Sequence, residues 1–460
     1  MKIFVIASDV PSQKGNRMGV TAVNIVLCEL LGGLSRLGHK IVLQMLFNPF
    51  RSTASLSSVE EGELLHLKEA GMEVLPAIYK EDYLPPVKSA TLLGVLTKIS
   101  RNLFGVAGIE EFYPSIRVRE VVCDRVRSHN IDAILTIWCP EGLASTQGCE
   151  GVPRVAYQGD IDFIPAMMRA KDVLLFSDLS SQKPSFVRKQ LGWFLTRFRL
   201  AKFKQAHLRL MREVDVVANV TASNADFYKK HGHPGSVYIR NIWSDMGVEG
   251  SPDFEKNQKG KKSNRPIKII GHVGYLNRTG STYGLTFLLV DVLPRIEQIM
   301  KGLDYQIHII GGGEVAPALK PRVQNGRVLM RGFVEDLDGE LRSSDIFLML
   351  NNAGPYQAAY SRHILAWSMG LCMIVHANSR KAIPEITHEG NALVGSTPDE
   401  IARMVFQAAT DSDLNLRIRR GGRATYEKYF TPSVVAEALS EEIARVVAGE
   451  ETRHTRAFEA

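Results

Sequence analysis

The chain has 460 residues, of which 45% are hydrophobic and 23% are charged. This length and composition argue against a disordered chain and predict a globular protein with two domains, each with its own core. The formal net charge of +7 favours an anionic partner, such as nucleotide phosphate, nucleic acid or an acidic membrane surface, without deciding among them.

Cysteine usage and apolar runs indicate the compartment. The five cysteines are Cys28, Cys123, Cys139, Cys149 and Cys372. They form no CxxC pair and have no His partner at metal-ligand spacing. This usage favours a reducing cytoplasm. The apolar start is too short for a signal peptide, and nowhere do about 18 uncharged apolar residues run together, so we expect no membrane span.

Short apolar strands alternate with helical segments in the first half of the chain. Residues 2–7 predict a buried strand, a polar glycine-containing loop follows, and residues 20–40 have helical apolar spacing. Further strands are predicted at 40–46, 132–138, 154–160, 214–223 and 237–242. Because these strands are apolar throughout and alternate with helices, residues 1–249 are expected to form a Rossmann-like domain around a parallel sheet.

A polar linker then precedes a second alternating pattern. Residues 250–266 are rich in Pro, Gly, Ser, Asn and charge and have no apolar period. Strands are predicted again at 267–274, 305–313, 328–334, 345–351 and 371–377. Residues 267–430 are therefore expected to form a second Rossmann-like domain, with a ligand cleft between the carboxyl ends of the two sheets.

Several motifs carry a family resemblance. The first half contains "SRLGHKIVLQML" and "VYIRNIWSD", and the second contains "GHVGYLNRTGSTYGLTFLLVDVLPRI", "IHIIGGGE" and "RGFVEDLDGELRSSDIFLML". In this order and spacing they resemble GT-B glycosyltransferases, and within that class glycosyltransferase family 4. The resemblance implies an α/β GT-B fold, a nucleotide-sugar donor on the second domain, and a helix and tail at 431–460 that return toward the first.

The segment around Arg362 lies in a long stretch without acids. No Asp or Glu occurs between positions 345 and 385. A carboxylate would oppose the negative charge that gathers on a diphosphate leaving group, so an acid-free wall with Arg362 at a helix start suits a diphosphate. The alternative is a core helix over residues 360–370 with Arg362 in solvent.

The same segment departs from the family at two positions. Relatives usually carry a Glu five residues before the glycine that Gly370 matches, and often another eight residues earlier. Leu365 and Gln357 stand at these positions. Gln357 can still exchange hydrogen bonds with sugar hydroxyls, whereas Leu365 cannot, and Tyr360 is the nearest other polar side chain.

The loop at 274–284 also departs from the usual phosphate loop. Gly274 matches the family's glycine, but tyrosines replace the expected Arg and Lys, and the loop resembles a "GxxxYxPNxxG" form instead. Arg278 is its only cation, with an exposed turn residue as the alternative, and backbone N–H groups at a helix start can hold phosphate oxygens. By resemblance, the backbone at Phe333 and Val334 faces the nucleobase.

The first domain offers fewer candidates. By resemblance, Gly19 lies in the loop under the donor phosphates, where Lys14 or Arg17 faces either an anionic acceptor or solvent. Asp160 is the candidate to stabilise positive charge on the sugar or to orient the acceptor hydroxyl, with a cap or turn role as the alternative. Retention of configuration and independence from metal are implied by the resemblance, and the sequence has no DxD-type cluster.

Residues 186–213 predict a basic helix with an aromatic-rich apolar face. Such a helix can lie in an anionic membrane surface, as a peripheral contact. It can equally pack on the first sheet with its cations in water. Nucleic-acid binding would need a recognisable module, and none is visible.

Three functions remain open. The first is a retaining, metal-independent glycosyltransferase of the hexosyltransferase type, without a cofactor, that transfers a sugar to a glycan or lipid-linked acceptor in bacterial surface polysaccharide or glycoconjugate synthesis. It would act in the cytoplasm, with the inner face of the cell membrane as an additional place. The second is a GT-B epimerase or phosphorylase. The third is a non-catalytic GT-B protein that binds a glycan or a partner.

We predict that limited proteolysis cuts the chain first within residues 255–264, because the charged, apolar-free composition there is typical of an exposed linker. Mass spectrometry of the early fragments checks this prediction. Two fragments divided at this stretch are expected. Rapid cleavage elsewhere, with residues 255–264 still intact, would show that the predicted domain boundary is wrong.

Overall fold

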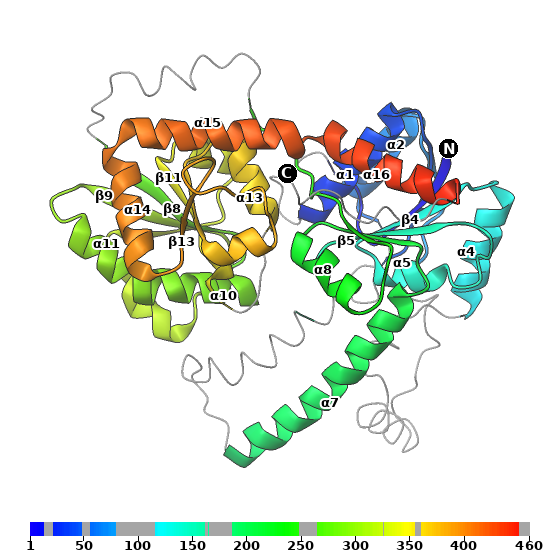
Figure 1. Cartoon of the computed structure of the whole chain (residues 1–460), viewed down its shortest axis with the longest axis horizontal. Helices are drawn as coiled ribbons and strands as arrows, with labels where there is room; N and C mark the ends of the chain where they lie inside the picture. Colours follow the sequence, from blue (N-terminus) through cyan, green and yellow to red (C-terminus); the bar gives the residue numbers. More distant parts are fainter. Residues whose placement is uncertain are drawn as a thin grey trace.

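The computed structural model describes residues 1–12, 22–47, 56–79, 116–161, 164, 186–247, 265–324, 326–354 and 360–449. Two parallel sheets with helices packed around them form the two halves of the described chain (Figure 1). The predicted pair of Rossmann-like parallel sheets is therefore confirmed.

The first sheet has the strand order β3-β2-β1-β4-β5-β6-β7. Its strands are β1 (Lys2–Ala7), β2 (Lys40–Met45), β3 (Glu73–Val74), β4 (Ala133–Ile137), β5 (Arg154–Gln158), β6 (Val216–Asn219) and β7 (Ser236–Tyr238). The chain adds β2 and β3 on one side of β1 and then returns to add β4 on the other. This reversal makes the carboxyl edge between β1 and β4 the switch point of the sheet, where ligands of such folds bind.

The second sheet repeats this plan with the order β10-β9-β8-β11-β12-β13. Its strands are β8 (Ile267–Val273), β9 (Tyr305–Ile310), β10 (Val328–Gly332), β11 (Ile346–Met349), β12 (Met373–His376) and β13 (Leu393–Gly395). The switch point lies between β8 and β11.

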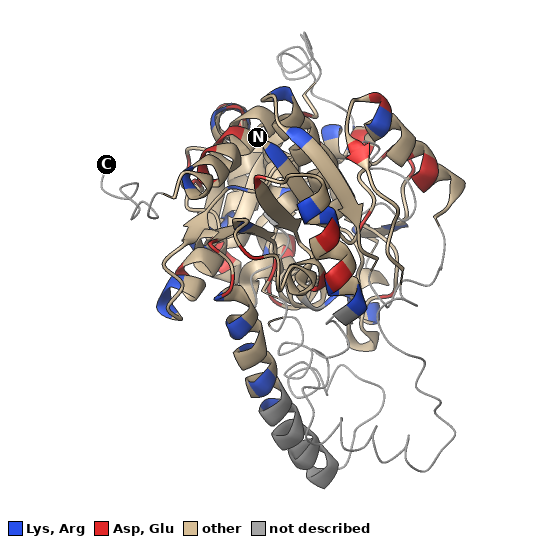
Figure 2. Ribbon diagram, turned by 90° about the vertical axis from the view of Figure 1, so that its right-hand side faces the viewer, with Lys and Arg blue, Asp and Glu red and all other residues tan. Residues whose placement is uncertain are grey.

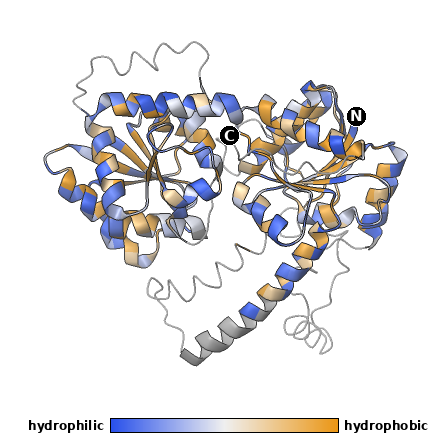
Figure 3. Cartoon of the chain, in the orientation of Figure 1, coloured by the Kyte–Doolittle hydropathy of each residue, from blue (hydrophilic) through white to orange (hydrophobic). Residues whose placement is uncertain are grey.

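Burial on both faces explains why the strands are apolar throughout. Ile3 and Val5 of β1 pack into one core cluster, whereas Phe4 and Ile6 pack into a second cluster on the opposite face. In the second sheet, Ile269 and Ile270 likewise face different clusters. Figure 3 shows the hydrophobic residues concentrated in the strands and in the helix faces against them.

Helices follow most strands and cover the sheets. In the first half they are α1 (Ala22–Arg36), α2 (Ser58–Glu69), α4 (Ile116–Ser128), α5 (Pro140–Ser145), α7 (Phe186–Met211) and α8 (Ala222–Lys230). In the second half they are α10 (Thr279–Thr286), the π-helix η2 (Phe287–Val292), α11 (Leu293–Ile299), α12 (Leu337–Arg342), α13 (Tyr360–Ser368), α14 (Pro398–Thr410) and α15 (Ser412–Tyr429). Short 3-10 turns are η3 (Pro317–Gln324), η4 (Asn351–Ala353) and η5 (Ala377–Lys381).

The final helix α16 (Pro432–Val447) lies against α1 of the first half (Figure 1). Val435, Ala436 and Leu439 belong to the same core cluster as the residues of β1. The contact is close, because a Cβ added at Gly33 would lie 2.5 Å from the Cβ of Ala436. The domain boundaries at 249 and 267 stay a prediction, since the linker between them lies outside the described residues.

The basic helix α7 extends away from the first sheet (Figure 1), and Figure 2 shows Lys and Arg along its described part. Toward its C-terminal end, Leu210 and Met211 are buried in a core cluster against the first sheet. Lys204 lies with its Nζ 5.4 Å from the ring centre of Phe227 on α8. The packed-helix alternative therefore holds for this end of α7.

We predict opposite outcomes for two adjacent glycines of α1. Gly33→Ala should lower the free energy of unfolding by about 1–3 kcal/mol, because the new methyl group collides with Ala436 of α16. Gly32→Ala is the matched control, since its methyl would meet only the flexible Arg36 side chain, at 3.3 Å. It should be neutral or stabilising by up to about 1 kcal/mol, as alanine favours helix. Urea unfolding measures both; equal effects would refute the close packing.

Candidate functional site

Three loops at the carboxyl edge of the second sheet are tied together. The backbone N–H of Gly274, after β8, donates to the carbonyl of Ile310 at 2.9 Å, and the N–H of Gly311 donates to Gly332 at 2.7 Å. Gly274 and Gly311 have φ values of +116° and +139°, and a Cβ at Gly311 would lie 1.9 Å from the carbonyl oxygen of Gly274. Only glycine fits this approach, which brings backbone close to any ligand at the edge.

Arg362 extends its side chain over the first of these loops. It is the third residue of α13, and its Nη2 lies 3.0 Å from the position that a Cβ on Gly274 would occupy. The structure thus brings together Gly274 and Arg362, two of the residues singled out in the sequence. A cation from α13 therefore lies over the loop after β8.

The charge of Arg362 has no counterion among the described residues. Its Nη1 is buried and has no hydrogen-bond partner in the part of the chain that the structure describes. Burial lowers the pKa of Arg362 to about 10, so the guanidinium still carries its charge at neutral pH. A half-buried, unpaired cation costs free energy that a bound anion would recover.

Other polar groups with unused hydrogen-bonding capacity lie on the elements around Arg362. His272 of β8, Ser281 of α10 and Asn351 of η4 are all at least nine-tenths buried, and each has a side-chain atom without a partner in the described chain. Burial, together with the positive charge of Arg362, holds the pKa of His272 well below its ordinary value. His272 is therefore neutral and can donate or accept a hydrogen bond without adding charge.

The position of this cluster agrees with the topology. Gly274 follows β8 and Asn351 follows β11, the two strands that flank the switch point of the second sheet. Helix α10 packs closely beside them, because a Cβ at Gly284 would lie 2.9 Å from the backbone of Asn351. His272, Ser281 and Asn351 were not among the residues predicted from the sequence. A histidine inside the apolar run "IKIIGHVG" was the one available signal.

The remaining sequence candidates are more exposed or lie outside the described residues. Arg278 is exposed at the start of α10, with its guanidinium carbon 5.8 Å from the ring centre of Tyr275. Phe333 is 54% exposed after β10, whereas Val334 packs against the core. Tyr360 begins α13, but its side chain lies outside the described part of the structure, as do Gln357 and Gly19.

Two acidic side chains lie near the switch point of the first sheet. Asp9 follows β1, and Glu141, which is 3% exposed, lies at the start of α5 after β4. Burial raises the pKa of Glu141 to about 7. Trp138, between β4 and α5, has a φ of +47° and covers Gly159, where a Cβ would lie 3.0 Å from its ring. Asp160, exposed after β5, lies next to this glycine.

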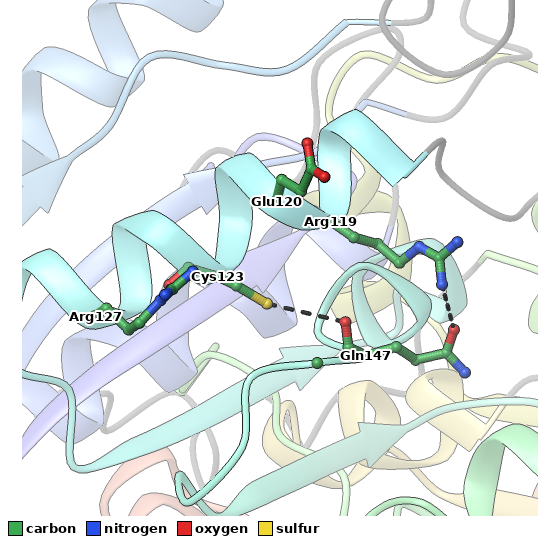
Figure 4. A pocket seen from close by; sticks show the side chains of 6 residues that line it. Arg119, Glu120, Cys123, Arg127 and Gln147 are labelled. Atoms are coloured by element: carbon green, nitrogen blue, oxygen red, sulfur yellow. Dashed lines mark hydrogen bonds between the residues drawn. The ribbon is translucent and has the colours of Figure 1, made fainter.

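A pocket lies elsewhere on the first half, against α4 (Figure 4). It is lined by Arg119, Glu120, Cys123, Arg127, Gln147 and Gly148. Arg119 donates to the side-chain oxygen of Gln147 at 3.4 Å. Its residues come from α4 and the turn after α5 rather than from the strand ends at either switch point, so we assign the pocket no part in the site.

The cysteines differ from expectation. Cys123 and Cys149 are joined by a disulfide, whereas Cys28, Cys139 and Cys372 are free and buried. The sequence favoured a reducing cytoplasm, from the lack of short spacings, and indicated no disulfide pair. It failed to predict this pair because its members are 26 residues apart in sequence and meet only when α4 packs beside the turn after α5.

Among the described residues, no group of three or more His, Cys, Asp or Glu side chains is arranged to hold a metal ion. Within the same residues, every helix is too short or too polar to cross a bilayer.

The second half of the chain matches a known family. Residues 267–411 match the family model described as glycosyl transferases group 1. This range contains both Gly274 and Arg362. None of the curated protein sequences is significantly similar to the chain.

Several solved structures share the fold over almost the whole length. Sucrose-phosphate synthase from Thermosynechococcus elongatus is 12% identical with a TM-score of 0.59, over 98% of this chain and 100% of that one. Anabaena HepE in complex with UDP is 13% identical with a TM-score of 0.56, over 96% and 100%. The apo lipopolysaccharide outer core galactosyltransferase WaaB is 10% identical with a TM-score of 0.55, over 97% and 100%. These likenesses confirm the predicted GT-B fold.

We predict that Leu365→Glu destabilises the protein in a pH-dependent way. Leu365 is 7% exposed and packs in a core cluster with Ile364 and Trp367. A carboxylate buried there without a partner should cost about 3–5 kcal/mol of unfolding free energy. Because burial raises the folded-state pKa above the unfolded value of about 4.3, the variant should lose stability as pH rises from 4 to 8.

Denaturant unfolding at pH 5 and pH 8 checks this prediction. Leu365→Met is the control, as a swap of similar volume that should cost less than about 1.5 kcal/mol at both pH values. A Glu variant as stable as the parent at pH 8 would mean that the site still accommodates the carboxylate that relatives carry.

Proposed function

We propose that this chain, whose second half belongs to the group 1 glycosyl transferases, is a retaining glycosyltransferase that uses a nucleotide-sugar donor. The observation that carries the proposal is the half-buried guanidinium of Arg362, whose Nη1 is fully buried and which lies over Gly274 without a counterion among the described residues. A nucleoside diphosphate supplies the anion that this place lacks. UDP is the first choice, because HepE, a structure of the same fold, was solved with UDP and with UDP-glucose.

In the proposed reaction, negative charge gathers on the diphosphate as the bond to the sugar breaks. Arg362 stabilises this charge, and the N–H groups at the start of α10 hold phosphate oxygens. Neutral His272 adds a hydrogen bond without a second cation. The lack of acids between positions 345 and 385 keeps opposing charge away from the leaving group.

The other contacts with the donor are proposed from the family resemblance. The backbone at Phe333 and Val334 faces the nucleobase, and Gly19 lies under the phosphates. Arg278 adds a second positive charge at the mouth of the loop. Gln357 and Tyr360 hold the sugar or ribose hydroxyls that relatives hold with a carboxylate. Because neutral hydrogen bonds are weaker than those to a carboxylate, we expect modest donor affinity.

On the first domain, we propose that Asp160 stabilises positive charge on the sugar or orients the acceptor hydroxyl. The acceptor is a glycan or a lipid-linked glycan in bacterial surface polysaccharide or glycoconjugate synthesis. WaaB, which shares the fold, is a lipopolysaccharide outer core galactosyltransferase. We place the reaction in the cytoplasm, independent of metal, with α7 as a peripheral contact with an anionic membrane.

A non-catalytic binding protein is the second candidate, and the observation that favours it is Leu365. This side chain is packed in the core at the position where relatives carry a Glu that contacts the donor. A nucleotide-sugar epimerase or phosphorylase is the third. Donor hydrolysis or isomerisation without any acceptor would favour the third, and failure to bind any nucleotide would favour a glycan- or partner-binding role.

We predict that Arg362→Met weakens nucleoside diphosphate binding at least tenfold, because charge-assisted hydrogen bonds contribute about 1.5–3 kcal/mol. Calorimetric titration with UDP, GDP, ADP and CMP measures the affinities of parent and variant. Arg322→Met, the same change at an exposed arginine of η3, is the control and should leave affinity unchanged.

Thermal unfolding establishes that the variant is folded. Its midpoint should not fall, since the substitution removes an unpaired buried cation rather than a stabilising ion pair. A folded Arg362→Met protein with parental affinity would sink the assignment of Arg362 to the diphosphate.

A further inference from the structure

The segment that leaves the first sheet is attached to the second half through Glu385. The carboxylate of Glu385 accepts a hydrogen bond from the Tyr238 hydroxyl at 3.0 Å and another from Nε of Arg240 at 2.5 Å. Tyr238 ends β7 of the first sheet, whereas Glu385 follows β12 and η5 of the second half. The side chain of Glu385, which is 7% exposed, therefore joins the two halves.

Arg240 is itself held from several sides. Its carbonyl oxygen accepts a hydrogen bond from the Tyr157 hydroxyl of β5 at 3.0 Å. Its guanidinium carbon lies 4.7 Å from the ring centre of Tyr429, at the end of α15. The first half thus holds the backbone of Arg240, while its guanidinium meets both Tyr429 and Glu385 of the second half.

A second contact reaches the same loop. The backbone N–H of Ala222, the first residue of α8, donates to the carbonyl of Ala382 at 3.0 Å. Residues 382–385 thus meet the first half through a backbone hydrogen bond and through the Glu385 ion pair. Two attachment points on one short loop restrict rotation of one half about the other.

This loop is connected to the proposed donor site through hydrogen bonds. In η5, Asn378 donates to the carbonyl of Asn352 at 3.1 Å, and Asn352 donates in return to the Ser379 hydroxyl at 3.0 Å. Asn352 belongs to η4, which packs against Gly284 of α10. A continuous set of contacts therefore runs from Glu385 to the helix whose start borders Gly274.

We propose that Glu385 is a positioning residue that fixes the orientation of the donor loop relative to the carboxyl edge of the first sheet. Its carboxylate acts through Tyr238 and Arg240, and touches no substrate. The orientation of the two halves does not depend on the proposed function. The effect of Glu385 on nucleotide binding rests on the proposed function. The orientation of the halves and the nucleotide affinity are therefore measured separately.

The orientation is tested by the distance between spin labels at Lys68→Cys on α2 and Lys301→Cys after α11, two exposed positions on different halves. The parent should give a narrow distance distribution without ligand. Glu385→Ala should broaden it, and Glu385→Gln, which keeps an acceptor oxygen, should broaden it less. Glu389→Gln, on the same loop and exposed, is the matched control and should leave it unchanged.

Adding Tyr238→Phe to Glu385→Ala should broaden the distribution no further, because both substitutions remove the same hydrogen bond. Far-ultraviolet circular dichroism confirms that each variant is folded. A folded Glu385→Ala protein with the parental distance distribution would overturn the proposal.

Calorimetry with UDP measures the coupling to the donor site. Affinity should fall about three- to tenfold in Glu385→Ala, although this residue lies outside the nucleotide contacts, and Glu385→Gln should restore part of it. Parental UDP affinity combined with a broadened distribution would overturn the coupling. If the parent itself fails to bind UDP, the choice of donor is wrong, while the label distances still decide the role of Glu385.

Discussion

Both sheets of this chain are parallel and buried on both faces, and this constraint decides where polar chemistry can lie. A side chain that points up or down from β1 or β8 enters a core, so a charged group has little room along the strands. Polar side chains can gather where the strands end, and the carboxyl edge is the end at which loops and helix starts converge. The cluster around Arg362 and the pair Asp9 and Glu141 both occupy such ends.

At the proposed donor edge, the positive charge closest to Gly274 comes from α13, whereas Arg278 of the loop after β8 is exposed. A loop cation can move with its loop, whereas Arg362 is held in the first turn of a packed helix, close over Gly274. Preorganised charge in a surrounding of low polarity acts strongly on an anion, because little reorganisation is needed when the ligand arrives. His272 stays neutral beside it, since burial and the charge of Arg362 lower its pKa.

The sequence was sufficient to predict features that depend on residues close to one another along the chain. The strand at residues 2–7 could be predicted because burial on both faces makes the run apolar, and Arg362 could be singled out because a lack of acids is visible along the chain. His272 could not be assigned, since its role depends on the approach of α13 to β8 across about 90 residues. The pair Cys123 and Cys149 depends on helix packing in the same way. Leu365 was recognised as a departure, but only its burial shows that the position belongs to the core.

The packing of α16 on α1 has a consequence for how the protein is made. Val435, Ala436, Leu439 and Ile443 complete the core that begins with the residues of β1, yet they are synthesised after the whole second sheet. A nascent chain on the ribosome therefore carries an incomplete first half, with the α1 surface still open, until about the last turn of α16 has emerged. The late closure also makes the folding of the first half depend on successful folding of the second.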